Sequence, residues 1–171
     1  IPETPDTPFI QMDVGQNHAC GIDTDGYIEC WGSNTENKTA PPLGRFAAVQ
    51  TGQKHSCAIN TVGEIQCWGY DPEDGRVSDT PEGRFSKLFV GYESNCALDS
   101  DGAATCWGRD NQNILTGRPQ IAFKHISLGY EHACGIDTND VARCWGSSNN
   151  GKTTVDSDSD GADFLNDCDD S

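Results

Sequence analysis

Cysteines are the residues of this sequence whose type and spacing point most directly to chemistry. Eight of the nine form four pairs, nine residues separate the members of each pair, and Trp-Gly follows the second member. This spacing favours disulfides in an oxidising compartment, because zinc ribbons and redox sites use the closer C-x-x-C spacing. The pairs are Cys20 and Cys30, Cys57 and Cys67, Cys96 and Cys106, and Cys134 and Cys144.

An acidic stretch near the C-terminal end is the candidate metal site. Residues 156–167 read D-S-D-S-D-G-A-D-F-L-N-D, with Asp at positions 1, 3, 5 and 12 and Gly at position 6. Alternate carboxylates can converge on one hard cation, and the glycine permits the sharp turn, so the spacing predicts a Ca²⁺ site. The expected ligands are Asp156, Asp158, Asp160 and Asp167, with the main-chain carbonyl of Ala162. The alternatives are a ligand role for Asp163 and a solvated acidic tail without metal.

The ninth cysteine, Cys168, follows this acidic stretch. The stretch and its cysteine resemble the calcium loops of thrombospondin type 3 repeats, which also carry a nearby cysteine. In an oxidising compartment we expect Cys168 to have a partner outside the repeats, either in another chain or in a downstream segment.

Three histidines share one position before the first cysteine of a pair. They are His18, His55 and His132, and Ser94 takes the same position in the third pair. Histidines around an axis could hold a metal, but Ser94 favours a hydrogen-bonding role toward neighbouring backbone. No nucleophile elbow, P-loop, H-E-x-x-H or Rossmann glycine pattern is present. We therefore predict no catalytic residues and no enzyme.

A longer repeat must position these residues. The unit reads F-x5-G-x2-[H/S]-x-C-x9-C-W-G and recurs after 37, 39 and 38 residues. Periods of about 40 indicate solenoids, propellers or arrays. Apolar residues alternate before the glycine and predict a strand, and turn residues such as those at 24–26 predict a hairpin between the cysteines. Opposed cysteines across such a hairpin predict a disulfide within each pair, contributing about 2–4 kcal/mol each.

The segments between units are polar and differ most from one copy to the next. After each Trp-Gly we expect a loop and then a short fourth strand, at 38–40, 76–78, 114–116 and 152–155. Variable loops on a fixed scaffold are a usual place for specificity. The tryptophans are expected to pack against the disulfides, with an exposed aromatic ring for sugars as the alternative; they are Trp31, Trp68, Trp107 and Trp145.

The pattern G-x-x-H-x-C-x-I/L-x-x-x-G-x-x-x-C-W-G resembles the regulator of chromosome condensation repeat family, and most of all its secreted bacterial branch. The resemblance covers 9–155 and implies an all-β propeller with one blade per repeat. Family propellers usually have seven blades, so four units either close a smaller ring, which we expect, or form part of a larger one. Nuclear nucleotide exchange does not suit an acidic, disulfide-rich chain.

The net charge and the composition of each segment limit the classes of partner and the location that we expect. The net charge is -16, which disfavours nucleic acid and anionic membranes, and no apolar run approaches the ~18 residues of a membrane span. We expect a proline-rich arm at 1–8, a propeller at 9–155 and a calcium-loop tail at 156–171. The sequence begins with Ile1 and shows no signal peptide, so we expect a segment removed before it. The predicted location is extracellular or at the cell surface.

The leading functional hypothesis is a non-enzymatic extracellular module for protein–protein interaction and assembly. In this hypothesis it is a structural subunit of a surface layer or fibre, joined through its terminal segments and calcium. The alternative is a soluble inhibitor or ligand-binding propeller that acts through its inter-repeat loops, as a secreted β-lactamase inhibitor of similar architecture does. The candidate partners are other protein chains, further copies of the same chain and a glycan.

Overall fold

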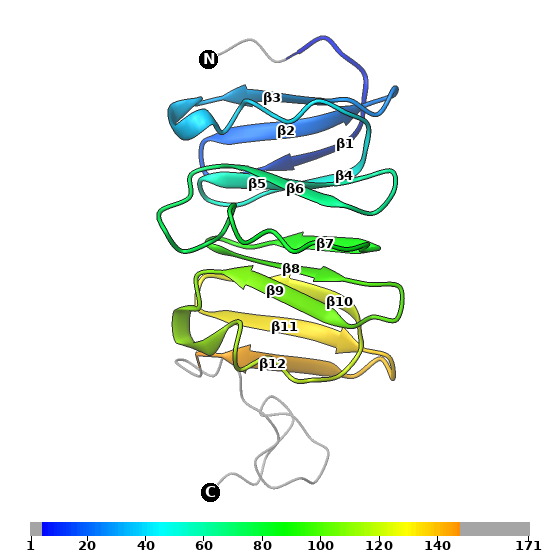
Figure 1. The fold of residues 1–171 in the computed structure, drawn as a ribbon, viewed down its shortest axis with the longest axis vertical. Coiled ribbons are helices and arrows are strands. Elements are labelled where there is room, and N and C mark those ends of the chain that lie inside the picture. The colour runs from blue at the N-terminus through cyan, green and yellow to red at the C-terminus, as the bar shows by residue number, and fades with distance from the viewer. Residues whose placement is uncertain (1–4, 148–171) are drawn as a thin grey trace, which may run out of the picture.

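The computed structural model describes residues 5–147, which form four separate three-stranded antiparallel sheets. Each sheet is one blade, and its strands follow one another in the chain (Figure 1). The strands are, in blade 1, β1 (Phe9–Val14), β2 (His18–Asp23) and β3 (Ile28–Gly32); in blade 2, β4 (Phe46–Thr51), β5 (His55–Asn60) and β6 (Ile65–Gly69); in blade 3, β7 (Lys87–Val90), β8 (Ser94–Leu98) and β9 (Ala104–Gly108); in blade 4, β10 (Phe123–Leu128), β11 (His132–Asp137) and β12 (Ala142–Gly146). The prediction of an all-β propeller with four blades is confirmed.

A side chain supports the tight turn that joins the second and third strands of each blade. In blade 1, the Asp23 carboxylate accepts hydrogen bonds from the backbone N–H groups of Asp25 and Tyr27, at 2.8 and 2.9 Å. Gly26 then adopts a left-handed φ of 90°. The fourth turn lacks a glycine, and Asp140 takes the left-handed conformation there with a φ of 67°. Short polar side chains tolerate this conformation better than other residues do.

Each turn brings the two cysteines of a pair directly opposite one another. In blade 1 the register aligns Cys20 with Cys30 on the neighbouring strand. The Cα atoms of all four pairs lie 4.0–4.1 Å apart, and all four pairs form disulfides. The predicted pairing within each hairpin is therefore confirmed, one disulfide per blade.

The apolar core lies between blades. One buried cluster combines Cys20 and Ile22 of blade 1 with Val49 and Trp68 of blade 2. Equivalent clusters join blade 2 to blade 3 and blade 3 to blade 4. Each tryptophan from blade 2 onward thus packs against the disulfide cysteine of the preceding blade. A thin apolar composition suffices because each interface needs only a few large side chains.

Main-chain hydrogen bonds fix the position of each blade relative to the one before it. The N–H of Phe46, at the start of β4, donates to the carbonyl of Gly26 in the turn of blade 1 at 2.8 Å. Phe85 and Phe123 make the same bond to Gly63 and Gly102. Each hairpin turn therefore also anchors the first strand of the next blade.

The expected fourth strand is absent from the first three blades. Residues 38–39, 76–78 and 114–116 form turns, and the segment 152–155 lies outside the described residues. Lys38 has right-handed helical dihedral angles, with φ of -64° and ψ of -28°, just after the short 3₁₀ helix η1 (Thr35–Asn37). Its carbonyl accepts the indole N–H of Trp68 at 2.9 Å. The segment turns inward because this carbonyl must reach a tryptophan of the next blade.

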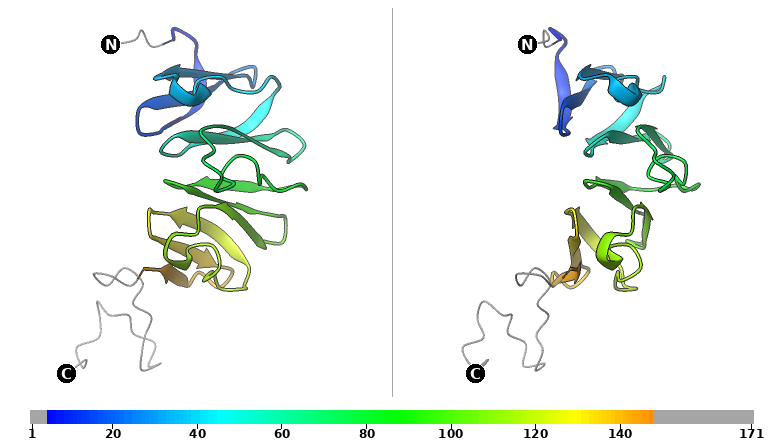
Figure 2. Two further views of the ribbon diagram at one scale, coloured as in Figure 1. Left: turned by 60° about the vertical axis from the view of Figure 1, so that its left-hand side comes forward. Right: turned by 90° about the vertical axis from the view of Figure 1, so that its left-hand side faces the viewer.

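The four blades form an open arc, so the expectation that they close into a ring is wrong (Figure 2). Blade 1 and blade 4 lie at opposite ends, with blades 2 and 3 between them. The repeated contacts described above give each blade only a modest rotation from its neighbour, and four such rotations do not complete a circle. Within residues 5–147, no helix is long and apolar enough to cross a membrane.

Candidate ligand-binding cleft

The glycine that follows the first strand of each blade forms a continuous row on the concave side of the arc. These residues are Gly15, Gly52, Gly91 and Gly129. A Cβ on Gly52 would lie 2.5 Å from the carbonyl oxygen of Gly91 and 2.5 Å from the His55 ring. Such distances are too short for any side chain, so glycine permits the backbones of neighbouring blades to approach closely.

The residue after each of these glycines lines a cleft of about 390 Å³. The four residues are Gln16, Gln53, Tyr92 and Tyr130. The Gln53 amide donates to the Tyr92 hydroxyl across the boundary between blades 2 and 3. The rings of Tyr92 and Tyr130 meet edge to face, with centroids 5.0 Å apart. Both tyrosines are partly exposed, so aromatic surface and hydrogen-bonding groups are open to solvent together.

The cleft has the composition of a binding site. Val14, Val90 and Leu128 supply its apolar walls, and none of its described lining residues carries a charge. Apolar and aromatic walls with a few convergent polar groups are typical of sites for small molecules and peptides. An uncharged cleft on a chain of net charge -16 favours a ligand recognised by stacking and neutral hydrogen bonds.

The predicted histidine position lies behind this cleft, where two of its three histidines are buried. His18 Nε2 lies 2.9 Å from Ser56 Oγ, and His55 Nε2 lies 2.7 Å from Asn95 Oδ1. Burial lowers the pKa of both rings, and that of His55 falls to about 4. The histidines have the predicted hydrogen-bonding role, but their partners are side chains of the next blade rather than backbone. A metal role for them has no support from this geometry.

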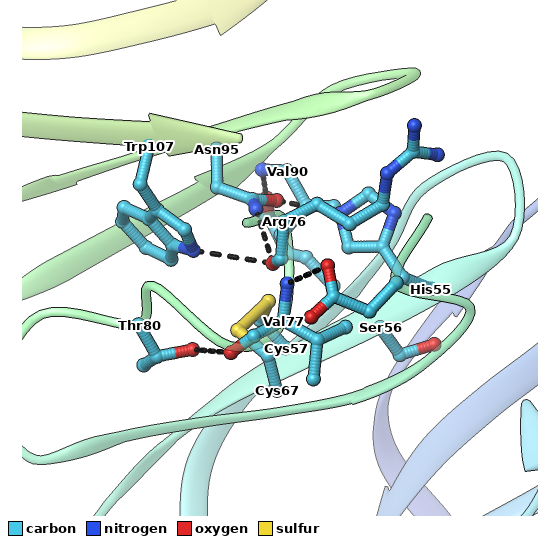
Figure 3. The surroundings of a disulfide bond; sticks show 12 residues. His55, Ser56, Cys57, Cys67, Arg76, Val77, Thr80, Val90, Asn95 and Trp107 are labelled. Atoms are coloured by element: carbon cyan, nitrogen blue, oxygen red, sulfur yellow. Dashed lines mark hydrogen bonds between the residues drawn. A yellow bond between two sulfur atoms is a disulfide. The ribbon is translucent and has the colours of Figure 1, made fainter. Parts of the chain in front are cut away.

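The loop after blade 2 contains a buried cation. Arg76 is 1% exposed, and its guanidinium donates to Asp74 and lies 3.5 Å from the Glu93 carboxylate. Burial alone would raise the pKa of Asp74, but the hydrogen bonds and charge of Arg76 lower it. The Arg76 carbonyl accepts hydrogen bonds from Asn95 and Trp107, beside the Cys57–Cys67 disulfide (Figure 3). This inter-repeat loop is therefore part of the contact between blades 2 and 3.

The other predicted site residues lie outside the described part of the chain. This applies to the calcium ligands Asp156, Asp158, Asp160, Ala162 and Asp167, and to Cys168. Within residues 5–147, no group of three or more His, Cys, Asp or Glu side chains could hold a metal ion. Thr7 of the N-terminal arm donates to the Glu29 carboxylate at 2.9 Å, so this part of the arm contacts blade 1.

Sequence reasoning missed the cleft. Its signal was the residue directly after the repeat glycine, which changes from Gln in the first two units to Tyr in the last two. The repeat pattern leaves this position undefined, and the sequence alone predicts specificity in the inter-repeat loops instead. The structure shows that Lys38, Arg76 and Ile114 of those loops are buried, so much of each loop serves packing.

The fold and the repeat define the class of the molecule as a β-propeller arc of four blades with one disulfide per blade, similar to RCC1-type propellers. The model of the regulator of chromosome condensation (RCC1) repeat matches residues 9–37 and 123–152, in the first and fourth units. No curated protein matches the chain significantly in sequence.

Several solved structures share the fold. The ectodomain of the receptor kinase CR4 from Physcomitrella patens is 24% identical with a TM-score of 0.73, over 86% of this chain and 43% of that one. The CRINKLY WD40 ectodomain of the Arabidopsis thaliana receptor kinase ACR4 is 24% identical with a TM-score of 0.70, over 82% and 51%. Yeast RCC1 (Prp20), in complex with Kap60, is 17% identical with a TM-score of 0.69, over 86% and 46%. The chain spans about half the length of these structures.

Proposed function

We propose that the chain is a non-enzymatic extracellular interaction module that binds a partner in the concave cleft. The observation that carries this proposal is the row of Gln16, Gln53, Tyr92 and Tyr130, four residues at one repeat position that share one uncharged cleft. Tyrosine and glutamine side chains combine contact area with hydrogen bonding, which suits an extended peptide or a glycan.

Three further findings support this proposal. The four disulfides suit an oxidising environment, such as that of secreted and extracellular proteins. Two of the structural neighbours are receptor ectodomains, and the yeast neighbour was solved with a bound protein partner. His18 and His55 are engaged by side chains of the next blade.

A library of random peptides displayed on phage tests the cleft directly. Peptides selected on the wild-type chain are expected to lose binding to the double variant Tyr92→Ala/Tyr130→Ala. The matched control is Tyr27→Ala, which removes a similarly exposed tyrosine from the turn of blade 1. A glycan array read with the same three proteins separates the two ligand classes. Selected ligands that bind the double variant as well as wild type would place the binding surface elsewhere.

Assembly through the terminal segments is the second candidate function. The described arm residues contact blade 1, whereas the described chain ends at Ser147 after β12, in the last blade (Figure 1). Segments that leave from opposite ends of an arc are placed to join neighbouring molecules head to tail, as in a surface layer or fibre. With calcium in the predicted loop, the expected result is polymerisation that a chelator reverses, measured by light scattering. A chain whose mass in millimolar calcium is the same as in chelator would contradict it.

A further inference from the structure

Every contact between two blades joins two different faces. One, here called the cysteine face, presents the first cysteine and the aliphatic residue two positions later, such as Cys20 and Ile22. The other, the tryptophan face, belongs to the following blade and presents a residue of the first strand together with the tryptophan, such as Val49 and Trp68. The buried clusters repeat this pairing at all three junctions of the arc.

Within residues 5–147, no blade packs on the tryptophan face of blade 1. Its central residue, Met12, is 55% exposed, whereas Val49 at the same position of blade 2 is 0% exposed. Leu88 and Ile126, which hold this position in blades 3 and 4, are also buried. Trp31 is only partly buried, while the other three tryptophans are buried and donate their indole N–H to a carbonyl of the preceding loop.

The cysteine face of blade 4 is open in the same way. Ile136 is 42% exposed, whereas Ile22 at the same position of blade 1 is 0% exposed. Cys134 is likewise only partly buried, although the equivalent cysteines of the other blades are fully buried. The two ends of the arc therefore expose the two complementary halves of one interface.

We infer that a second copy of this chain docks on these two faces, so that two arcs close one ring. The cysteine face of blade 4 in each copy packs on the tryptophan face of blade 1 in the other. Ile136 then contacts Met12 and Trp31, as Ile22 contacts Val49 and Trp68 within the arc. A twofold axis through the centre of the ring makes both contacts identical and leaves no face exposed, which is the closed symmetry that favours a dimer over a polymer.

Two observations favour a second copy as the occupant. The contact continues an interface that the chain already makes three times with the same residue types. The arc also covers only 43–51% of the solved propellers that it matches, so the gap it leaves is about as large as the arc itself.

A position that makes a polar contact at a junction between blades is exposed at the end of the arc. The Gln11 amide bridges the backbone N–H and carbonyl of Val49 in the next blade, at 3.1 and 3.2 Å. His125 holds the position of Gln11 in blade 4 and is exposed there. Its ring packs edge to face on Phe89 of blade 3, with centroids 4.9 Å apart. This inference depends neither on the cleft nor on calcium.

The oligomeric state of the 171-residue chain tests the inference. The buffer contains a chelator, which removes any calcium-dependent assembly, and Cys168 is blocked or replaced by Ser, which removes intermolecular disulfides. Under these conditions light scattering after size exclusion should give a mass of twice 18.4 kDa. Met12→Asp and Ile136→Asp should each give the monomer mass. The matched control is Ile10→Asp, on the same strand as Met12 at a position that is exposed in every blade, which should remain a dimer.

Mixing the two monomeric variants distinguishes this pairing from others. One contact in the mixed pair keeps wild-type residues on both sides, so the mixture should associate although neither variant does alone. Ellipticity in the near ultraviolet confirms that each variant is folded. A wild-type chain that stays monomeric at about 0.1 mM, where even weak complexes are populated, would overturn the inference and leave the faces to further blades. A mixture that fails to associate would overturn the head-to-tail pairing.

Discussion

The imidazole of His55 in blade 2 hydrogen-bonds the amide of Asn95 in blade 3, with 2.7 Å between Nε2 and Oδ1. Asn95 in turn donates to the carbonyl of Arg76, in the loop that joins these blades. One buried ring therefore couples two blades and their connecting loop. Because the ring is fully buried, its protonation state affects the stability of the whole junction.

Acid should destabilise the fold through His55. In the unfolded chain its pKa is near 6.5, whereas burial lowers the folded pKa to about 4. Between these values the unfolded state binds more protons, so the free energy of unfolding falls as the pH falls from about 6.5 to 4, by up to about 3 kcal/mol. Urea unfolding at several pH values measures the slope.

The variant His55→Ser should flatten this slope, since Ser94 holds the same position in blade 3. His125→Ser is the control, because His125 is exposed, and it should retain the wild-type slope. Equal slopes for wild type and His55→Ser would show that another group carries the acid sensitivity.

Arg76 should contribute far more to stability than its exposed neighbour Arg109, although both contact Glu93. The variant Arg76→Ala leaves Asp74 and Glu93 beside a buried gap without their cation, and should cost about 3–5 kcal/mol. Arg109→Ala removes a half-exposed ion pair and should cost at most about 1 kcal/mol. Denaturant midpoints of the oxidised proteins provide the comparison, and similar losses for both variants would contradict it.

The glycine row should not accept a methyl group. Gly52→Ala places a Cβ against the Gly91 carbonyl and the His55 ring, and should cost about 1–3 kcal/mol. Gly26→Asn is the comparison, because a Cβ at Gly26 meets its neighbours at 3.6 Å or more and Asn accepts a left-handed φ. The Gly26→Asn variant should lose less than about 1 kcal/mol of the free energy of unfolding. Thermal unfolding measures both, and a stable Gly52→Ala protein would show that the blades can separate without penalty.

The acidic stretch after the propeller should bind calcium. Titration calorimetry of the wild-type chain should show one site at millimolar Ca²⁺ or below, and the double variant Asp158→Asn/Asp160→Asn should abolish the heat. Asp169→Asn/Asp170→Asn removes the same charge outside the predicted loop and should keep the site. Loss of binding in both variants would indicate diffuse attraction by the acidic residues rather than a defined loop.

The repeat and its hairpins could be predicted because local rules determine them. Symmetric turn residues between Cys20 and Cys30 set the register, and that register alone decides the disulfide. The fourth strand was predicted wrongly because its position is decided by a distant group. The carbonyl of Lys38 accepts a hydrogen bond from Trp68, thirty residues later. No local pattern at residues 38–40 predicts this contact.

Ring closure and the cleft could not be predicted for a related reason. Both depend on the angle between successive blades, which arises from side-chain packing such as that of Val49 against Ile22. A repeat count gives the number of blades but not the curvature. The cleft residues could not be recognised either, because a position that is Gln in two units and Tyr in the other two looks unconstrained until all four copies are seen to line one cleft.

Each of the four disulfides joins two neighbouring strands within one blade. None of these bonds crosses the loop between blades 2 and 3, where Arg84 is exposed. A single tryptic cut at Arg84 should therefore yield two separate bands in a denaturing gel even without reductant. Under native conditions the halves should migrate together, held only by the packed junction. Each disulfide thus stabilises one hairpin, whereas the covalent link between blades is the main chain alone.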